Sequence, residues 1–145
     1  MSQNIDEGPK DPWIKINFDN SLLSGIPHID EEHKKLYQLA ADILRAYLNN
    51  PRDKNIEEFL LELRTTLSEH FEHEEVEMAQ RGFPEFIEHQ ESHSTLMTHF
   101  LRLHASYTHN LMSFSDLYTF LTKEVIQDHI IKYDLIFHQF LDQKA

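Results

Sequence analysis

The sequence contains no cysteine and only three glycines among its 145 residues. Without cysteine the chain can form no disulfide, no thiolate metal site and no cysteine nucleophile. So few glycines argue against hairpin-rich folds and phosphate-binding loops, which need the positive φ angles that glycine supplies. No stretch approaches the roughly 18 apolar residues of a membrane span, and the N-terminus lacks the basic and apolar segments of a signal peptide. These absences predict a soluble, cytoplasmic, all-helical protein.

Basic residues are also scarce, because 13 Lys and Arg face 25 Asp and Glu and the formal net charge is -12. A surface this negative repels phosphate backbones and anionic lipids. We therefore expect no nucleic-acid partner and no membrane association. A chain of this length can bury the core of one domain, and nothing in it demands more than a monomer.

The first part of the chain differs from the rest. Residues 1–28 contain three of the five prolines and show no sustained helical period. They predict an extended N-terminal arm that packs on a bundle formed by residues 29–145. Beyond the arm, apolar residues recur at steps of three and four, which is the period of an amphipathic helix.

Four such segments follow one another. Asp30 is a candidate N-cap for the first, which ends before Pro51. The second opens near Asp53 and is expected to stop at Gly82, a natural C-terminal residue. Both segments are long enough for a bundle helix of roughly 30 to 40 Å.

The remaining two segments complete the bundle. Pro84 suits the first turn of the third helix, and Ser113, Ser115 or Asp116 could cap the fourth. Short connections make successive helices antiparallel neighbours. The predicted fold is an all-α, antiparallel, up-down-up-down four-helix bundle with an extended N-terminal arm.

Histidine is common, with 11 residues, and polar pairs interrupt the apolar stripes of the predicted helices. His70 and Glu74 lie four residues apart, as do His89 and His93. Each pair therefore projects from one helix face toward the same point. Such pairs are typical of metal sites built between facing helices.

The first and last helices add to this set. His33 lies on the first stripe, and the last stripe contains His129 before it continues through Tyr133, Ile136 and Phe140. Asp134 lies five residues after His129, about 140° around an α-helix, which is a looser arrangement.

Two carboxylates in this polar set need a counter-charge. Burying Glu74 and Asp134 unpaired would cost several kcal/mol each. No lysine or arginine occupies the central levels of the stripes. A metal cation would satisfy the carboxylates and the imidazoles together.

The ligand types narrow the metal. Imidazoles and carboxylates without sulfur suit iron, manganese or zinc. Seven side chains are too many for one ion but fit two. If both carboxylates bridge, the protein supplies about nine bonds and a bridging solvent two more, while two octahedral ions offer about twelve positions. Roughly one position stays open, where a small diatomic molecule could bind.

The other histidines sit off the stripes or lack a ligand partner one turn away, and they are interpreted as hydrogen-bonded core or surface residues: His28, His73, His99, His104, His109 and His138. Around His70 we also expect Glu72, Glu75 and Glu77 on the solvent face.

Four motifs carry a resemblance to a known family: GIPHIDEEHKKL (residues 25–36), HFEHEEVEM (70–78), GFPEFIEHQESH (82–93) and HIIKYD (129–134). The sequence resembles the hemerythrin family, and within it the single-domain bacterial hemerythrins. Seven ligands in the right order on four helices make this signal far more specific than any single pair.

The resemblance implies two iron ions (Fe2+/Fe3+) joined by an oxo or hydroxo group and by two bridging carboxylates. By position, it assigns one iron to His89, His93 and His129, the other to His33 and His70, and the bridges to Glu74 and Asp134. Dioxygen would bind reversibly at the iron held by two histidines. The implied function is oxygen carriage, storage or delivery rather than catalysis, with a protein acceptor of the oxygen as a further expected partner.

An apolar pocket would keep this binding reversible by excluding water and protons. Candidates, chosen by their proximity to the ligand levels, are Ile29, Leu36, Leu67, Phe71, Val125 and Ile126. Family members often carry a tryptophan four residues before the last histidine ligand, and this chain has Val125 there. Pocket volume and autoxidation rate are expected to differ accordingly.

The sequence excludes two other kinds of metal site. A ferritin-like diiron carboxylate site needs a Glu-x-x-His motif on each of two helices, and the sequence contains none. A zinc protease needs His-Glu-x-x-His, which is also absent. Three alternatives share the fold: a diiron redox enzyme acting on nitric oxide or peroxide, an oxygen- or iron-sensing interaction module, and a metal-free acidic bundle.

Overall fold

A computed structural model of the protein describes residues 22–144, which are helical throughout apart from short connections and contain no strand. Most of the predicted arm, residues 1–21, lies outside this described range. The elements are α2 (Pro27–Asn49), α3 (Asn55–Gln80), α4 (Phe86–Thr108), α5 (Phe114–Phe120), η4 (Leu121–Tyr133) and α6 (Asp134–Lys144). The last three follow one another without a break and form one rod, so the described chain consists of four helical rods, as expected.

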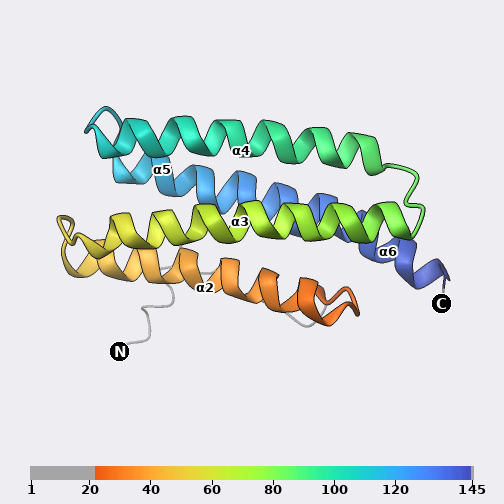
Figure 1. The fold of residues 1–145 in the computed structure, drawn as a ribbon. Coiled ribbons are helices and arrows are strands. Elements are labelled where there is room, and N and C mark those ends of the chain that lie inside the picture. The colour runs from red at the N-terminus through yellow and green to blue at the C-terminus, as the bar shows by residue number, and fades with distance from the viewer. Residues whose placement is uncertain (1–21, 145) are drawn as a thin grey trace.

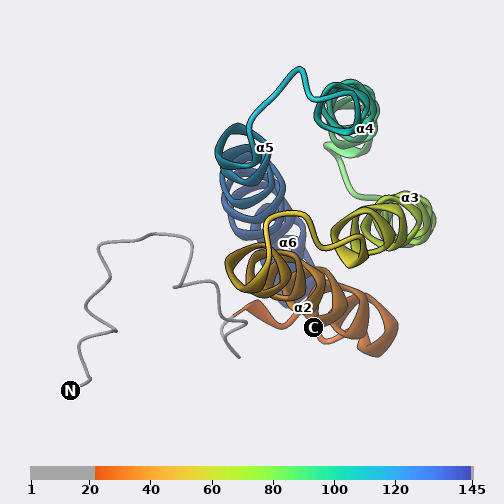
Figure 2. The same ribbon diagram turned by 90° about the vertical axis from the view of Figure 1, so that its left-hand side faces the viewer.

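The four rods lie side by side (Figure 1), and the view along them shows them around a common centre (Figure 2). α2 packs on α3, α3 on α4, and α4 on α5 and η4, while η4 returns to contact α2. This closed ring of contacts fits a four-helix bundle. It lets each rod turn one side chain stripe toward a shared interior.

The start of α2 differs from the prediction. The helix begins at Pro27, where the missing N–H of proline costs nothing, so Asp30 is not the N-cap. Instead the buried carboxylate of Asp30 accepts hydrogen bonds from the N–H of Ser24 (2.7 Å), the hydroxyl of Ser24 (2.9 Å) and the N–H of Gly25 (3.2 Å). Asp30 thereby ties the chain that enters the helix to its first turn.

Two other predicted ends are confirmed and one is wrong. Gly82 follows α3 with φ +68°, a left-handed conformation that favours glycine. The hydroxyl of Ser113 caps the fourth rod by accepting the N–H of Asp116 at 3.1 Å. Pro84, however, lies in the turn before α4, which begins two residues later at Phe86.

The middle of the fourth rod is a π-helix over 13 residues, η4. At its end the N–H of Asp134 donates to the carbonyl oxygen of His129, five residues earlier. π-helical turns are rare and occur often at functional sites. Because the hydrogen bond of a π-helical turn joins residues five apart, His129 and Asp134 come to nearly the same face of the rod. An α-helix would have separated the two side chains by about 140° around its axis.

The same wide turn shifts the buried face of α6 by one residue. The predicted stripe residues Tyr133 and Ile136 are 46 % and 39 % exposed, whereas Phe137 and His138 are 0 % and 4 % exposed. An extra residue in one turn displaces every later side chain around the helix. The predicted stripe of this last helix is therefore wrong at Tyr133 and Ile136, although Phe140 is partly buried against the core as predicted.

The interior is divided into two apolar clusters by a polar layer. The large cluster contains Leu36, Leu67 and most other core residues, and the small one consists of Ile26, Ile29, Met78, Phe83 and Phe137. Along each rod, the predicted metal ligands lie between the residues of the two clusters.

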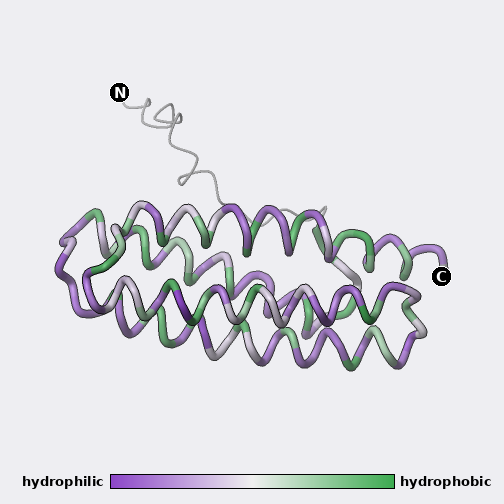
Figure 3. Tube along the Cα trace, turned by 90° about the horizontal axis from the view of Figure 1, so that it is seen from above, coloured by the Kyte–Doolittle hydropathy of each residue, from purple (hydrophilic) through white to green (hydrophobic). Residues whose placement is uncertain are grey.

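The outer surface of the bundle is largely polar. Hydrophilic and hydrophobic residues alternate along every rod (Figure 3), as amphipathic helices require. Within residues 22–144, no helix combines the length and the apolar composition needed to cross a bilayer.

Candidate metal centre

The structure brings all seven predicted ligands into the polar layer. None is more than 6 % exposed: His33, His70, Glu74, His89, His93, His129 and Asp134. They form two groups of possible metal ligands that share both carboxylates, and within each group the donor atoms lie within 4.8 Å of one another. Every rod contributes to the layer.

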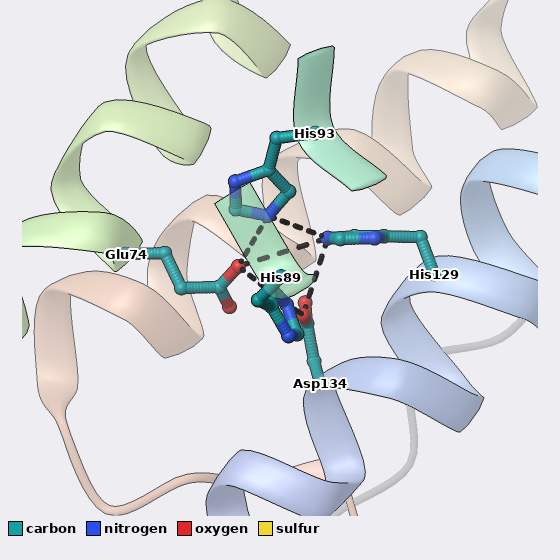
Figure 4. Close-up of side chains that lie close together, drawn as sticks. All are labelled: Glu74, His89, His93, His129 and Asp134. Atoms are coloured by element: carbon teal, nitrogen blue, oxygen red, sulfur yellow. Dashed lines mark hydrogen bonds and ion pairs between the residues drawn. The ribbon is translucent and has the colours of Figure 1, made fainter. Parts of the chain in front are cut away.

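The first group contains three histidines from α4 and η4, whose side chains point toward the carboxylates of Glu74 and Asp134 (Figure 4). Nε2 of His89 lies 2.8 Å from Oδ1 of Asp134, and Nε2 of His129 lies 3.1 Å from the same oxygen. Nε2 of His93 lies 3.1 Å from Oε1 of Glu74 and 3.0 Å from Nε2 of His129. Five donor atoms thus converge on one point.

The second group contains two histidines, from α2 and α3. Nε2 of His33 lies 3.0 Å from Nε2 of His70 and 3.0 Å from Oδ2 of Asp134. Oε2 of Glu74 lies 3.8 Å from His33 and 3.7 Å from His70. This group has four donors, one fewer than the first.

The two oxygens of each carboxylate face different groups. Oε1 of Glu74 and Oδ1 of Asp134 face the three histidines, while Oε2 and Oδ2 face the other two. A carboxylate that turns one oxygen toward each of two ions is a bridging ligand. The arrangement can therefore hold two cations side by side, with fewer protein donors on the side of His33 and His70.

Two further carboxylates contact two of the histidines at Nδ1, the ring nitrogen that does not face the donor groups. Oε1 of Glu32 accepts from Nδ1 of His70 at 2.8 Å, and Oε2 of Glu75 accepts from Nδ1 of His93 at 2.7 Å. A carboxylate at Nδ1 keeps the proton there and leaves Nε2 bare for a metal. The prediction that Glu75 belongs to the solvent face is therefore wrong, and Glu32 was not predicted at all.

Sequence patterns offer little signal for these two residues. Glu32 and Glu75 lie beside the inward stripes rather than on them, and each reaches a histidine of another helix. Only their adjacency to the ligands His33 and Glu74 distinguishes them from other surface acids.

The electrostatics of the layer are dominated by the two central carboxylates. Burial raises the pKa of Glu74 and so does Asp134, yet the surrounding imidazoles, His70 first, hold it well below its usual range. Burial likewise raises the pKa of Asp134, but His129 and His33 outweigh burial and keep it well below normal. Both groups therefore remain anionic.

The imidazoles respond in the opposite sense. Burial lowers the pKa of His33, but the hydrogen bonds to Asp134 and Glu74 outweigh burial and raise this pKa to about 10. The same opposition raises the pKa of His89 and of His129 to about 9. Without metal, protons on these rings neutralise the carboxylates, and a bound cation would take their place.

The donor set fits a metal better than it fits a proton network. Within the part of the chain that the structure describes, Oε2 of Glu74 is fully buried and has no hydrogen-bond partner. The ion-pair partners found for Glu74 and Asp134 are histidines. Imidazole and carboxylate donors around a buried anionic oxygen match a transition-metal site.

Comparison with protein families decides the assignment. The model of the hemerythrin HHE cation binding domain matches residues 24–141. The chain belongs to the hemerythrin family. The match spans all four rods and all seven residues of the polar layer, so this is a hemerythrin-type metal-binding domain. No match to the chain was found among curated proteins.

The six pocket residues predicted for this hemerythrin domain are all buried, but they do not lie in one place. Five belong to the large apolar cluster: Leu36, Leu67, Phe71, Val125 and Ile126. Ile29 belongs to the small cluster on the other side of the polar layer. Phe71 lies directly against a metal ligand, because its ring stacks on that of His93 with 4.0 Å between the centroids.

A groove of about 630 Å³ between α4 and η4 leads from the surface of the hemerythrin domain to the polar layer. His89 and His129 form part of its wall, and so do acidic residues such as Glu88 and Asp128. The groove therefore approaches the group of three histidines and not the group of two.

The six histidines not predicted as ligands differ in their exposure. His28, His73 and His109 are exposed, and His99 is half-buried. His104 is buried and pairs with Glu57 at 2.7 Å, as expected for a hydrogen-bonded core residue. His138 departs from that expectation, because it is buried and neither ring nitrogen has a hydrogen-bond partner within residues 22–144.

Proposed function

We propose that this domain binds dioxygen reversibly at two iron ions and serves in oxygen carriage, storage or delivery rather than as an enzyme. The observation that carries the proposal is the unequal sharing of donors: five on one side of the bridging carboxylates and four on the other. An ion on the poorer side keeps more room for an exogenous ligand. The family's metal-binding character supports the same assignment.

In this proposal the three histidines of the first group hold one iron, His33 and His70 hold the other, and Glu74 and Asp134 bridge them. When bound, the two irons would supply the pair of electrons that reversible dioxygen binding requires. His33 and His70, on the side with fewer protein donors, would leave room for the exogenous ligand.

The protein side chains keep the exchange reversible. The five core residues on the large-cluster side, among them Leu67 and Val125, exclude water from the polar layer. Glu32 and Glu75 hold the ring orientations of His70 and His93, so that the ligands need no rearrangement when dioxygen arrives or leaves.

The proposal includes the arrangement of the chain. We take the four rods as an antiparallel up-down-up-down bundle, which the short connections and the course of the ribbon in Figure 1 support. The N-terminal arm is proposed to pack on this bundle.

A second candidate function has one observation in its favour. The groove that reaches His89 and His129 offers solvent and small molecules a route to the three-histidine side. Such access would suit a redox enzyme that reduces nitric oxide or peroxide, because substrates and protons must reach the irons.

Anaerobic iron loading followed by exposure to air tests the two functions. Reversible binding predicts a visible charge-transfer absorption that forms in air and bleaches when oxygen is removed, over repeated cycles. An iron-loaded protein without any oxygen-dependent spectrum would defeat the carrier proposal. Sustained turnover of nitric oxide or peroxide by the same sample would favour the redox enzyme.

A further inference from the structure

Four buried ring nitrogens near the polar layer have no hydrogen-bond partner in the described chain: Nδ1 of His33, Nδ1 of His129 and both nitrogens of His138. The rings of His33 and His138 lie against each other, with centroids 5.8 Å apart and planes tilted by 38°. Folded proteins rarely leave buried polar atoms unsatisfied, and here three of the four occur in these two neighbouring side chains. Their proximity suggests that they satisfy one another.

His33 has a definite need for an acceptor. Its Nε2 faces His70 and Asp134 at 3.0 Å each, inside the donor group, so this nitrogen must be bare when a metal binds. The proton of the ring then resides on Nδ1. His70 and His93 deliver the corresponding proton to a carboxylate, but His33 has no carboxylate at Nδ1.

His138 can meet that need. It begins the second turn of α6, four residues after Asp134, and therefore lies above that residue on the same face. A neutral imidazole offers one acceptor nitrogen and one donor. No direct hydrogen bond joins the two rings in the described chain, and buried waters commonly join such neighbouring polar groups.

We propose that His138 is a positioning residue of the metal centre: one of its ring nitrogens accepts the Nδ1 proton of His33, with at most one ordered water between them. The inference rests on the proposed dinuclear centre but not on dioxygen as its ligand. It makes the two histidines of the open ion unequal, because His70 is backed by an anionic carboxylate and His33 by a neutral ring.

Cobalt(II) loading provides a test that does not depend on oxygen binding. Paramagnetic cobalt shifts the exchangeable N–H protons of its histidine ligands into a separate region of the proton NMR spectrum. In the wild-type protein we expect two ions per chain and a slowly exchanging signal from His33. In His138→Phe that signal should broaden or vanish, and the second ion should bind about 10- to 100-fold more weakly.

Two matched variants complete the design. His138→Gln retains an acceptor and should restore both the signal and most of the affinity. His104→Phe removes another buried histidine, paired with Glu57 away from the metal layer, and should change neither. Two ions and an unchanged His33 signal in His138→Phe would overturn the inference while leaving the dinuclear centre intact.

A measurement on the unaltered protein covers the case in which His138→Phe does not fold. In the zinc-loaded wild type, nitrogen NMR of the histidine rings should show His33 protonated at Nδ1 and His138 neutral, with one bare nitrogen in a hydrogen bond. A His138 ring that is doubly protonated or exchanges freely with solvent would contradict the proposal. A wild-type chain that takes up only one ion would instead overturn the centre itself, and this inference with it.

Discussion

Glu74 and Asp134 face each other across the polar layer, and each turns one oxygen toward three histidines and the other toward two. Glu74 belongs to α3 and Asp134 is the first residue of α6, so the two carboxylates come from the second and the fourth rod of the bundle. In the proposed dinuclear centre, each carboxylate would therefore serve both ions at once.

Glu74→Gln should therefore lower the metal content from two ions to one or none per chain. The amide keeps the shape of the side chain but removes the negative charge that both ions share. Metal content is measured after anaerobic iron loading and removal of excess metal. Glu72→Gln, on the exposed face of the same helix, is the control and should retain both ions. Full occupancy in Glu74→Gln would refute the bridging role.

Glu32→Gln should weaken metal binding about 10- to 100-fold without abolishing it, because Glu32 orients His70 and does not touch the ion. Competition with a chelator of known affinity measures the effect. Glu31→Gln provides a close control, since Glu31 is the preceding residue, is exposed, and pairs only with Lys34 at 3.7 Å among the described contacts. Equal affinities in the two variants would remove Glu32 from the metal centre.

The metal-free protein should lose stability at alkaline pH. The pKa of His33 is raised to about 10, and those of His89 and His129 to about 9. Groups with raised pKa values stabilise the fold fully below their unfolded pKa of about 6.5, and this contribution disappears as pH rises through 9 to 10.

At acidic pH the metal-free protein should also lose stability, but here the cause is protonation of carboxylates. The lowered pKa values of Glu74 and Asp134 stabilise the fold above about pH 4, and that contribution is lost as pH falls through their folded values. Thermal unfolding from pH 5 to 10, with and without metal, tests the alkaline part. Metal should abolish the alkaline loss, because it replaces the protons. A metal-free protein as stable at pH 10 as at pH 6 would contradict the charge assignment.

Much of this centre could be predicted from helical spacing alone. His70 with Glu74 and His89 with His93 lie one turn apart, so a regular α-helix already places each pair on one inward face. Glu32 and Glu75 could not be found in this way, because they lie beside the stripes and their roles depend on how neighbouring helices pack.

The fourth rod shows a different limit. The spacing of His129 and Asp134 looked loose only because an α-helix was assumed, whereas the π-helical hydrogen bond between them makes the spacing of five residues fit. The same turn moved Phe137 and His138 inward in place of Tyr133 and Ile136. Stripe analysis assigns one period to a whole helix and cannot register a local change of that period.

Val125→Phe should slow autoxidation of the oxygen-bound protein without changing its iron content. Val125 is 2 % exposed in the large apolar cluster, so a bigger apolar side chain there would exclude more water, at a packing cost of about 1–3 kcal/mol. The decay of the visible absorption in air gives the rate. Val76→Phe, the same change on an exposed site of α3, should leave the rate unaltered. An unchanged rate in Val125→Phe would show that this residue does not limit water access.

The most direct test of the central claim counts oxygen itself. A known amount of fully reduced, iron-loaded protein is mixed with a limited amount of dioxygen, the uptake is measured with an oxygen electrode, and the sample is then purged and the released gas quantified. Reversible binding predicts one dioxygen taken up for every two irons and the same amount recovered as dioxygen. Absence of uptake, or recovery of the oxygen only as hydrogen peroxide or water, would contradict the assignment of this domain as an oxygen-binding protein.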